Sequence, residues 1–467
     1  MALQEVSTLR RGGDVPRLRD GASLGELIDF DARAVSMRLL SDTEVFDIEM
    51  ERLFGRAWLA IAHESEIPAI GDFVVRQMGM DTVLVVRKSA DTINVMLNAC
   101  THRGMELERA EVGNAARFRC PYHGWVFDRD GAFIGAPCAK EMYGDGFDKS
   151  GWGLKQARVG SFAGMIFATW DPKAPTLADY LGDIQYYLEL MFKRTISGLE
   201  SVGPPQRWVI PANWKCAAEQ FAGDAYHTLT LHGSMFELNA RGDITARDAT
   251  PITGINVSTP RGHGLLFRNL KNIGKTGRGD EDTPLEALTK VPPHGVPPER
   301  IADLSEIFDA DAVRLLAESP PTVGQIFPNT AVMSTYIPSA GGGGTGPAIT
   351  IRTWNPHGPG EIEVFSWTLV ERSAGEDLRA HSRRTTLQSF GSSGMLEQDD
   401  AETWPSLTRV SRGLHGKQQW MRYPARSEPN KPEGWPGKGL VYAGITRDDN
   451  QWNWWTSYYQ FMTNEAW

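Results

Sequence analysis

The sequence contains little cysteine, no long apolar run and no excess of positive charge. Four of its 467 residues are cysteine, too few for the disulfide framework that stabilises many small secreted domains. No stretch approaches the roughly 18 consecutive apolar residues that a membrane-spanning helix requires, and residues 1–20 are polar, without a signal-peptide core. A formal net charge of −10 disfavours nucleic acid or an anionic membrane as the main partner. We therefore expect a cytoplasmic protein with reduced thiols.

Two of the four cysteines each stand close to a histidine. The pairs are Cys100-x-His102 and Cys120-x-x-His123, with 17 residues between them. Two thiolates and two imidazoles are the ligands of a Rieske [2Fe–2S] cluster, in which two histidines replace two cysteines on one iron. The same four side chains could instead bind zinc. An aromatic residue beside the second pair, Trp125, favours the cluster because an aromatic ring shields such a centre from water.

A second set of candidate metal ligands lies in the middle of the chain. Asp224 and His227 are predicted on one face of a helix that follows Pro211, and His232 comes five residues later. Two imidazoles and one carboxylate form the facial triad of non-haem Fe(II) oxygenases, which leaves positions open for O₂. On an ideal helix the two imidazoles diverge, so we expect a distortion or π-type turn between them. The carboxylate is expected from Glu397-Gln398-Asp399-Asp400.

With both motifs present, the chain resembles the large (α) subunits of Rieske non-haem iron ring-hydroxylating oxygenases. Within that family it is similar to the naphthalene, biphenyl and polycyclic-aromatic dioxygenase group, from about Ser41 to Phe461. The resemblance implies one set of ligands for the cluster and one for a mononuclear iron. In the second set Asp400 is the ligand, and Asp399 is its neighbour. The cluster ligands are Cys100, His102, Cys120 and His123, and the iron ligands are His227, His232 and Asp400.

The resemblance also implies partners. In the family, the cluster of one α subunit serves the iron of its neighbour in a ring of three. Asp224 then accepts hydrogen bonds from His123 of the partner subunit and from His227 of its own chain, as an electron-transfer bridge between subunits. A small β subunit would complete an α₃β₃ assembly. Electrons would come from NAD(P)H through a reductase and a ferredoxin, because the sequence contains no flavin or nicotinamide fingerprint.

The register with the family predicts a substrate pocket of uncharged, mostly apolar residues. An aromatic acid would require Arg or Lys within reach, so we expect a neutral mono- or polycyclic arene that receives both atoms of O₂ as a cis-dihydrodiol. Arg247 or Arg268 could still supply a cation, which leaves an acid such as phthalate open. Gln220 stands where several relatives have Asn, and its reach to the iron is undecided. The pocket positions are Gln220, Phe221, Ala225, Thr228, Val323, Met333, Ser389, Phe390 and Leu396.

The predicted fold is α+β. The resemblance implies a small all-β Rieske domain, residues 58–175, inserted into a catalytic domain, residues 176–467, whose antiparallel sheet is covered by helices in a helix-grip, START-like arrangement. Residues 1–57 are expected to pack on the catalytic domain. A chain of 467 residues with 41% hydrophobic content is consistent with more than one globular core.

Local patterns predict the individual elements. Ser41 is expected to be the N-cap of a helix, in the capping box Ser41-Asp42-Thr43-Glu44. From Gly242 to Arg300 we expect long connections over a pocket or, equally, a solvent-exposed loop region, and at Gly341 to Gly344 a flexible hairpin loop. Strands are expected at 72–78, 82–87, 93–99, 118–120, 161–170, 348–354 and 361–369, a hairpin at 125–134, and helices at 177–192, 377–386 and 392–404.

Two other functions fit parts of this pattern. A Rieske monooxygenase or demethylase would use the same two metal centres, and such enzymes often lack a β subunit. An electron-transfer or metal-sensing protein would bind the cluster alone and would need no iron at His227, His232 and Asp400.

Overall fold

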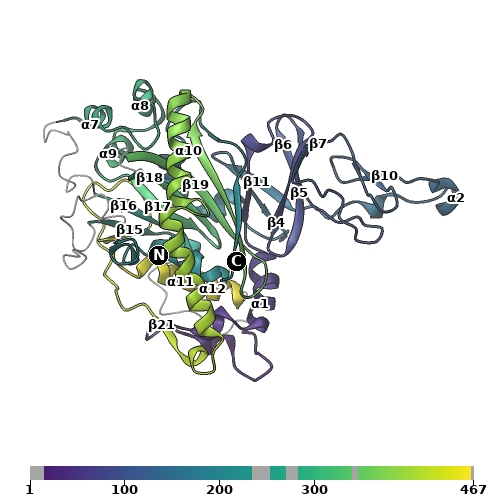
Figure 1. Ribbon diagram of the computed structural model, residues 1–467, viewed down its shortest axis with the longest axis horizontal. Helices are drawn as coiled ribbons and strands as arrows, with labels where there is room; N and C mark the ends of the chain where they lie inside the picture. The colour runs from purple at the N-terminus through teal and green to yellow at the C-terminus, as the bar shows by residue number, and fades with distance from the viewer. Residues whose placement is uncertain (1–14, 234–252, 270–281, 339–344, 464–466) are drawn as a thin grey trace. The chain divides into compact units, whose positions relative to one another are not determined.

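The computed structural model describes residues 15–233, 253–269, 282–338, 345–463 and 467. These residues form two compact units. Residues 54–177 make up the cluster unit, which carries both Cys/His pairs. The catalytic unit joins the residues up to 53 to those from 178 onward (Figure 1). None of the helices described is both long and apolar enough to span a lipid bilayer.

The catalytic unit is built on a nine-stranded antiparallel sheet. Its main path runs β13-β20-β19-β18-β17-β16-β15-β22, and β14 pairs with β20 beside that path. The strands expected at 348–354 and 361–369 correspond to β19 and β20, which pair with each other and place Arg352 opposite Ser366. The strands are β13 (Leu199–Ser201), β14 (Gln206–Ile210), β15 (Gly254–Ser258), β16 (Gly264–Arg268), β17 (Pro321–Ile326), β18 (Thr330–Pro338), β19 (Thr345–Pro356), β20 (Ile362–Glu371) and β22 (Leu440–Ala443).

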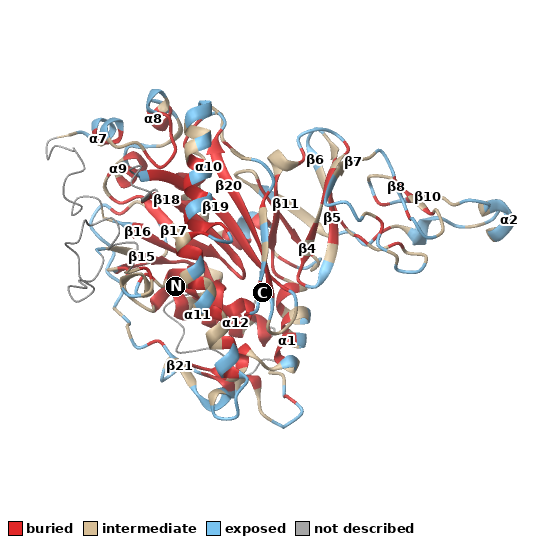
Figure 2. Ribbon diagram, viewed as in Figure 1, coloured by how far each residue is buried: buried red, intermediate tan, exposed pale blue. Residues whose placement is uncertain are grey.

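Helices pack against this sheet, and its two longest strands are buried along almost their whole length. The long helix α10 lies across β19 and β20 (Figure 1). Helices α5 and α12 also pack against the sheet. Every residue of β20 is buried, and in β19 only the first is exposed (Figure 2). The helices are α1 (Thr43–Glu49), α3 (Leu177–Leu181), α4 (Ile184–Phe192), α5 (Trp214–Gly223), α7 (Pro284–Lys290), α8 (Asp303–Ile307), α9 (Ala310–Glu318), α10 (Glu376–Phe390), α11 (Met395–Ser411) and α12 (Asp449–Met462).

A buried acid ties the N-terminal segment into the catalytic unit. Glu49, at the end of α1, is fully buried. Its carboxylate accepts hydrogen bonds from Trp214 Nε1 at 2.8 Å, Lys215 Nζ at 2.5 Å and Tyr458 Oη at 2.6 Å. Three donors, one of them a cation, offset the cost of removing this charge from water. The first turn of α5 is thereby held to α1 and α12.

The cluster unit consists mainly of three small antiparallel sheets. Their strand orders are β6-β5-β4-β7, β10-β9-β8 and β11-β12-β3. The predicted α+β class, with a small β domain and a larger helix-covered sheet, is confirmed. The elements are β3 (Leu59–His63), β4 (Asp72–Met78), β5 (Asp81–Ser89), β6 (Thr92–Leu97), β7 (Val112–Asn114), β8 (Phe118–Arg119), β9 (Val126–Phe127), β10 (Phe133–Gly135), α2 (Ala139–Tyr143), β11 (Arg158–Phe162) and β12 (Met165–Thr169).

Two local predictions were wrong: the residue that caps α1 and the single strand expected over 161–170. The N-cap of α1 is Asp42, whose carboxylate accepts from two backbone amides of the first turn. Ser41 instead donates its hydroxyl to the carbonyl of Ser411. The single strand expected over 161–170 is a hairpin of β11 and β12, because Ala163 and Gly164 both have positive φ, at 51° and 84°, as a tight two-residue turn requires.

The middle of the chain also differs from its prediction. The segment expected to consist of long connections contains the hairpin of β15 and β16 as well as α7. The helix expected over 177–192 is divided into α3 and α4 at Gly182, which has a φ of 52°. The glycine-rich run at 341–344 lies outside the described residues.

Candidate metal centres and active site

The two Cys/His loops of the cluster unit have the same backbone design. The first follows β6 and the second connects β8 to β9. The amide of Cys100 donates to the carbonyl of Met105 at 2.8 Å, and the amide of Cys120 donates to that of Trp125 at 2.7 Å. In each loop the glycine four residues after the cysteine has a positive φ, 74° in one and 72° in the other. Each loop is therefore closed on itself by main-chain bonds.

The four predicted cluster ligands fit the group that the motif implies. Both thiols are buried, and the two imidazole rings lie with their centroids 4.6 Å apart. Nδ1 of His102 and Nδ1 of His123 are buried, and neither has a hydrogen-bond partner among the described residues. A metal bound by these nitrogens would satisfy both. Burial raises the pKa of the Cys100 thiol to about 11, so cluster binding must displace its proton. The ring of Trp125 stacks on that of His102, with the ring centroids 4.8 Å apart.

The structure corrects the helix expected to carry Asp224 and His227. Helix α5 ends at Gly223, Asp224 is its C-cap, and His227 begins a separate 3₁₀ turn, His227–Leu229. The reason is local: Asp224 Oδ1 accepts from the backbone amides of Tyr226 at 2.9 Å and His227 at 3.1 Å. An aspartate that bonds to amides two and three residues later ends one turn and starts another. Between His227 and His232 lies the 3₁₀ turn, so the expected distortion is present there as a 3₁₀ rather than a π-type turn.

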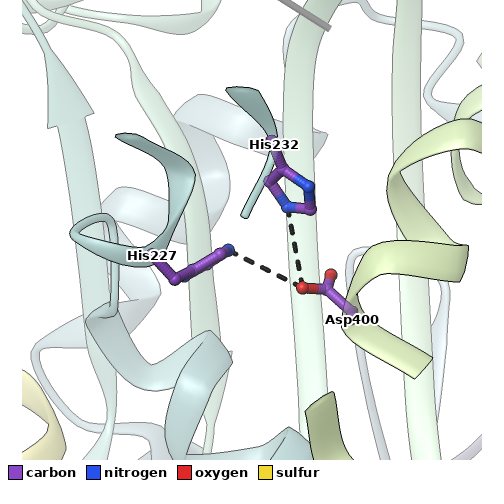
Figure 3. Close-up of side chains that lie close together, drawn as sticks. All are labelled: His227, His232 and Asp400. Carbon is purple, nitrogen blue, oxygen red and sulfur yellow. Dashed lines mark ion pairs between the residues drawn. The ribbon is translucent and has the colours of Figure 1, made fainter. Parts of the chain in front are cut away.

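His227, His232 and Asp400 converge from two regions of the catalytic unit (Figure 3). Nε2 of His227 lies 3.7 Å from Asp400 Oδ1, and Nε2 of His232 lies 3.6 Å from the same oxygen. One donor atom from each of the three residues lies within 4.8 Å of the other two. Two imidazoles and one carboxylate in this arrangement form a facial donor set suited to ferrous iron.

A carboxylate lies behind each histidine of this triad. Asp399 Oδ2 is 3.0 Å from Nδ1 of His232, and Asp224 Oδ2 is 3.4 Å from Nδ1 of His227. A carboxylate on Nδ1 directs Nε2 of the ring toward a metal. The role of Asp399 was missed from the sequence. The signal was the Asp399-Asp400 doublet, because adjacent helical side chains diverge by about 100° and can serve different partners.

Gln220 contacts the carboxylate of the triad. Its Nε2 donates to Asp400 Oδ1 at 2.7 Å, and its Oε1 accepts from Trp404 Nε1 at 2.8 Å. The amide oxygen is the atom of Gln220 that could bind a metal, and one of its two lone pairs already accepts from Trp404. Gln220 therefore links α5 to α11 through Asp400 and Trp404.

Burial and charge act in opposite directions on the triad. Burial raises the pKa of Asp400, while the two nearby imidazoles counteract part of this rise. At His227, burial works to lower the pKa, but Asp224 outweighs it and holds the pKa above its ordinary value. Each group thus depends on the opposite charge beside it, as expected for donors that meet in a buried site.

Most of the predicted pocket residues lie in two adjoining apolar clusters. Met333, Phe390 and Leu396 pack together, and Val323 contacts both this cluster and the one containing Ala225. Sequence reasoning missed four members of these clusters. Strand alternation could have indicated one of them, since Ile337 and Met333 lie on the same face of β18. The missed members are Ile337, Ala348, Leu266 and Ile445.

The remaining pocket positions are placed differently. Phe221 packs on Trp354, with ring centroids 4.8 Å apart. The hydroxyl of Ser389 is buried and donates to the carbonyl of Thr385. Thr228 is half-buried in the turn that begins at His227.

A buried cation not expected from the sequence lies next to the apolar clusters. The guanidinium carbon of Arg352 is 4.9 Å from the centroid of the Phe390 ring, and this arginine is 1% exposed. Its charge is balanced by Glu397 at 2.5 Å. Of the two cations considered from the sequence, Arg268 is exposed at the end of β16, and Arg247 lies outside the described residues.

Comparisons with known proteins agree with this geometry. Residues 57–157 match the Rieske [2Fe-2S] domain family, and residues 177–430 match the ring hydroxylating alpha subunit catalytic domain. The chain belongs to the ring-hydroxylating Rieske oxygenase α subunits. This family assignment confirms the resemblance inferred from the motifs. The chain is an oxidoreductase subunit of the Rieske dioxygenase type, with a [2Fe–2S] cluster and a mononuclear iron as cofactors.

Individual relatives cover nearly the whole α subunit. The chain is 37% identical to the biphenyl dioxygenase subunit alpha of Metapseudomonas furukawaii, over 89% of each protein. It is 33% identical to the N,N-dimethyl phenylurea N-demethylase subunit alpha of Sphingobium sp. (strain YBL2), over 98% of each. Its structure is similar to naphthalene 1,2-dioxygenase from Rhodococcus sp., with a TM-score of 0.82 at 37% identity, covering 93% of this chain and 95% of the other. An α subunit implies partner proteins in a multicomponent oxygenase.

Proposed function

We propose that this α subunit inserts both atoms of O₂ into a neutral mono- or polycyclic arene to give a cis-dihydrodiol. The observation that carries the proposal is the position of an apolar cluster on the two helices that lead to Asp400, next to a cation, Arg352, that is already paired. Phe390 ends α10, and Leu396 lies in the first turn of α11, four residues before Asp400.

The proposed ligands are those that the geometry brings together. His227, His232 and Asp400 would hold the ferrous iron, and Cys100, His102, Cys120 and His123 would hold the cluster. When bound, the iron supplies the site at which O₂ is bound and reduced, and the cluster supplies electrons one at a time. Asp399 and Gln220 keep His232 and Asp400 directed at the centre.

The apolar lining supports a neutral substrate over an aromatic acid. A substrate carboxylate would require a free cation, and the described cation beside this cluster, Arg352, already pairs with Glu397. The names of the biphenyl and naphthalene relatives point to neutral arenes as well. An aromatic acid such as phthalate should therefore be converted much more slowly than naphthalene.

Asp224 is the proposed electron-transfer bridge between subunits. One of its oxygens faces His227, and its side chain keeps 29% of its surface exposed. Its neighbour Tyr226 is 69% exposed, so this part of the catalytic unit is open to contact. In an α₃ ring, Asp224 would accept from His123 of the partner subunit.

The further partners belong to the same proposal. A β subunit would complete α₃β₃, and a ferredoxin with its NAD(P)H-dependent reductase would reduce the cluster in the cytoplasm. Exposed arginines near the cluster loops would attract an acidic ferredoxin. They are Arg103, Arg109, Arg117 and Arg119.

The N-demethylase relative supports a second candidate, a monooxygenase that removes a methyl group. One experiment separates the two. Anaerobically purified protein, supplied with a ferredoxin and reductase, would be given naphthalene, phenanthrene, biphenyl, phthalate and an N,N-dimethyl phenylurea under ¹⁸O₂. A dihydrodiol carrying two labelled atoms supports dihydroxylation. Exclusive N-demethylation of the urea, or faster turnover of phthalate than of every neutral arene, would refute it.

A further inference from the structure

Arg352 makes two directed contacts from the sheet to the helices above it. The residue lies on β19 and is almost completely buried, as is its partner Glu397. Nη1 of Arg352 donates to Glu397 Oε2 at 2.5 Å, and Nη2 donates to the carbonyl oxygen of Phe390 at 2.5 Å. The planar fork of a guanidinium fixes both acceptors relative to each other, which a lysine ammonium would not do.

These two acceptors define the junction between α10 and α11. Phe390 is the last residue of α10, and Glu397 lies in the first turn of α11, which begins at Met395. The connection between them is tight, because a Cβ on Gly394 would lie 2.5 Å from the carbonyl oxygen of Ser389. Arg352 therefore holds both sides of a closely folded turn.

The junction carries one proposed iron ligand, Asp400, and one residue of the predicted pocket, Phe390. Asp400 follows Glu397 by three residues, so both face inward from the same side of α11, and both are buried. Phe390 belongs to the apolar cluster with Leu396 and Met333. A shift of the junction would move a metal ligand and a pocket side chain together.

We propose that the Arg352–Glu397 pair is a positioning device that sets Phe390 relative to Asp400, and thereby the part of the arene presented to the iron. The inference rests on the proposed function. Neither Arg352 nor Glu397 is among the proposed iron ligands or the predicted pocket positions, and their hydrogen bonds fix the junction that carries both. Small displacements at such a site have large effects, since about 1 Å of misplacement can cost on the order of a hundredfold in rate.

The chain provides a matched control in a second buried pair of the same unit. Arg194 Nη2 lies 3.1 Å from Glu371 Oε1, and the two side chains are 2% and 0% exposed. Arg194 Nη1 also donates to Ser334 Oγ at 3.3 Å, and Glu371 Oε2 accepts from Thr195 Oγ1 at 2.7 Å. If buried ion pairs contribute only to folding, replacing either pair with apolar residues should change stability alone, and should leave the Fe(II) affinity and the regioisomer ratio as they are in the wild type.

The experiment replaces each pair with apolar residues of similar size. A double replacement avoids a lone buried charge and is often tolerated. The variants are Arg352→Met with Glu397→Leu, and the control Arg194→Met with Glu371→Leu. Three quantities are measured on full-length protein: the midpoint of thermal unfolding, the Fe(II) affinity after iron removal, and the ratio of dihydrodiol regioisomers formed from phenanthrene. The visible spectrum of the cluster shows whether the cluster unit is unaffected by the replacements.

The junction variant should bind Fe(II) about tenfold more weakly, and its regioisomer ratio should change several-fold, with the cluster spectrum unchanged. The control variant should keep both the affinity and the ratio of the wild type. Equal iron affinity and equal regioisomer ratio in the junction variant and the wild type would overturn the inference. If that variant does not fold, Arg352→Lys, which keeps the charge without the fork, is judged by the same two readouts.

Failure of the proposed function gives a different result. A wild-type enzyme that oxygenates no neutral arene would contradict the dioxygenase proposal. In that case the Fe(II) affinities of the junction and control variants still decide whether Arg352 positions Asp400.

Discussion

The two metal centres of this chain are constructed in different ways. The four proposed cluster ligands lie between residues 100 and 123, in two loops that are closed by their own backbone hydrogen bonds. The proposed iron ligands span residues 227 to 400 and are directed by side chains, including those of Asp399 and Gln220. One centre depends on local main-chain geometry, and the other depends on how distant helices pack.

The contrast extends to the surroundings of the ligands. Around the cluster, aromatic packing dominates, with Trp125 stacked on His102. Around the iron ligands, buried charged and amide groups form a connected set that runs from Arg352 through Glu397 to the helix carrying Asp400. Buried polar groups require partners with good geometry. Substitutions should therefore affect function even at some distance from the iron, whereas around the cluster only substitutions close to the ligands should do so.

The largest expected effect comes from removing one ligand from each centre. Asp400→Ala should lose the mononuclear iron and abolish turnover, because it removes the one carboxylate of the triad. His123→Ala should lose the cluster instead. Iron analysis and the visible spectrum distinguish the two losses. If either variant lost both metals while remaining folded, the two centres would not be independent.

A smaller effect is expected at Asp224, which belongs to neither ligand set. Asp224→Asn keeps an oxygen that can accept from the amides of Tyr226 and His227, so the turn should persist. It removes the negative charge beside His227. Both metals should remain bound, while turnover falls by about 100-fold or more.

The measurement for Asp224→Asn is the rate at which a pre-reduced cluster is reoxidised in the presence of arene and O₂. Asp377→Asn, an exposed position in the first turn of α10, serves as the control. Reoxidation at the wild-type rate in Asp224→Asn would exclude the bridge.

The smallest of the three effects is expected at Asp399. Asp399→Asn weakens the bond that directs His232 but leaves every proposed ligand in place. Fe(II) affinity should fall by about tenfold, with no change in the cluster spectrum. The comparison is Glu402→Gln, an exposed acid on the same helix. Equal affinities in the two variants would mean that Asp399 does not direct His232 toward the iron.

The sequence by itself determined the fold class, the two sets of candidate ligands and the family. This was possible because the cluster motif is short and its loops are closed by bonds within a few residues, and because Asp224, His227 and His232 stand close together in the chain. Element boundaries were less predictable, as the N-cap at Asp42 and the hairpin of β11 and β12 show.

Only the tertiary structure decided what surrounds the iron ligands. Arg352 is an ordinary basic residue in the sequence, and its pairing with Glu397 depends on β19 lying beneath the junction of α10 and α11. Likewise, Gln220 meets Asp400 and Trp404 because α5 and α11 pack together. Hydrogen bonds between residues 45 to 184 positions apart leave no local pattern, since their geometry is set by packing rather than by spacing along the chain.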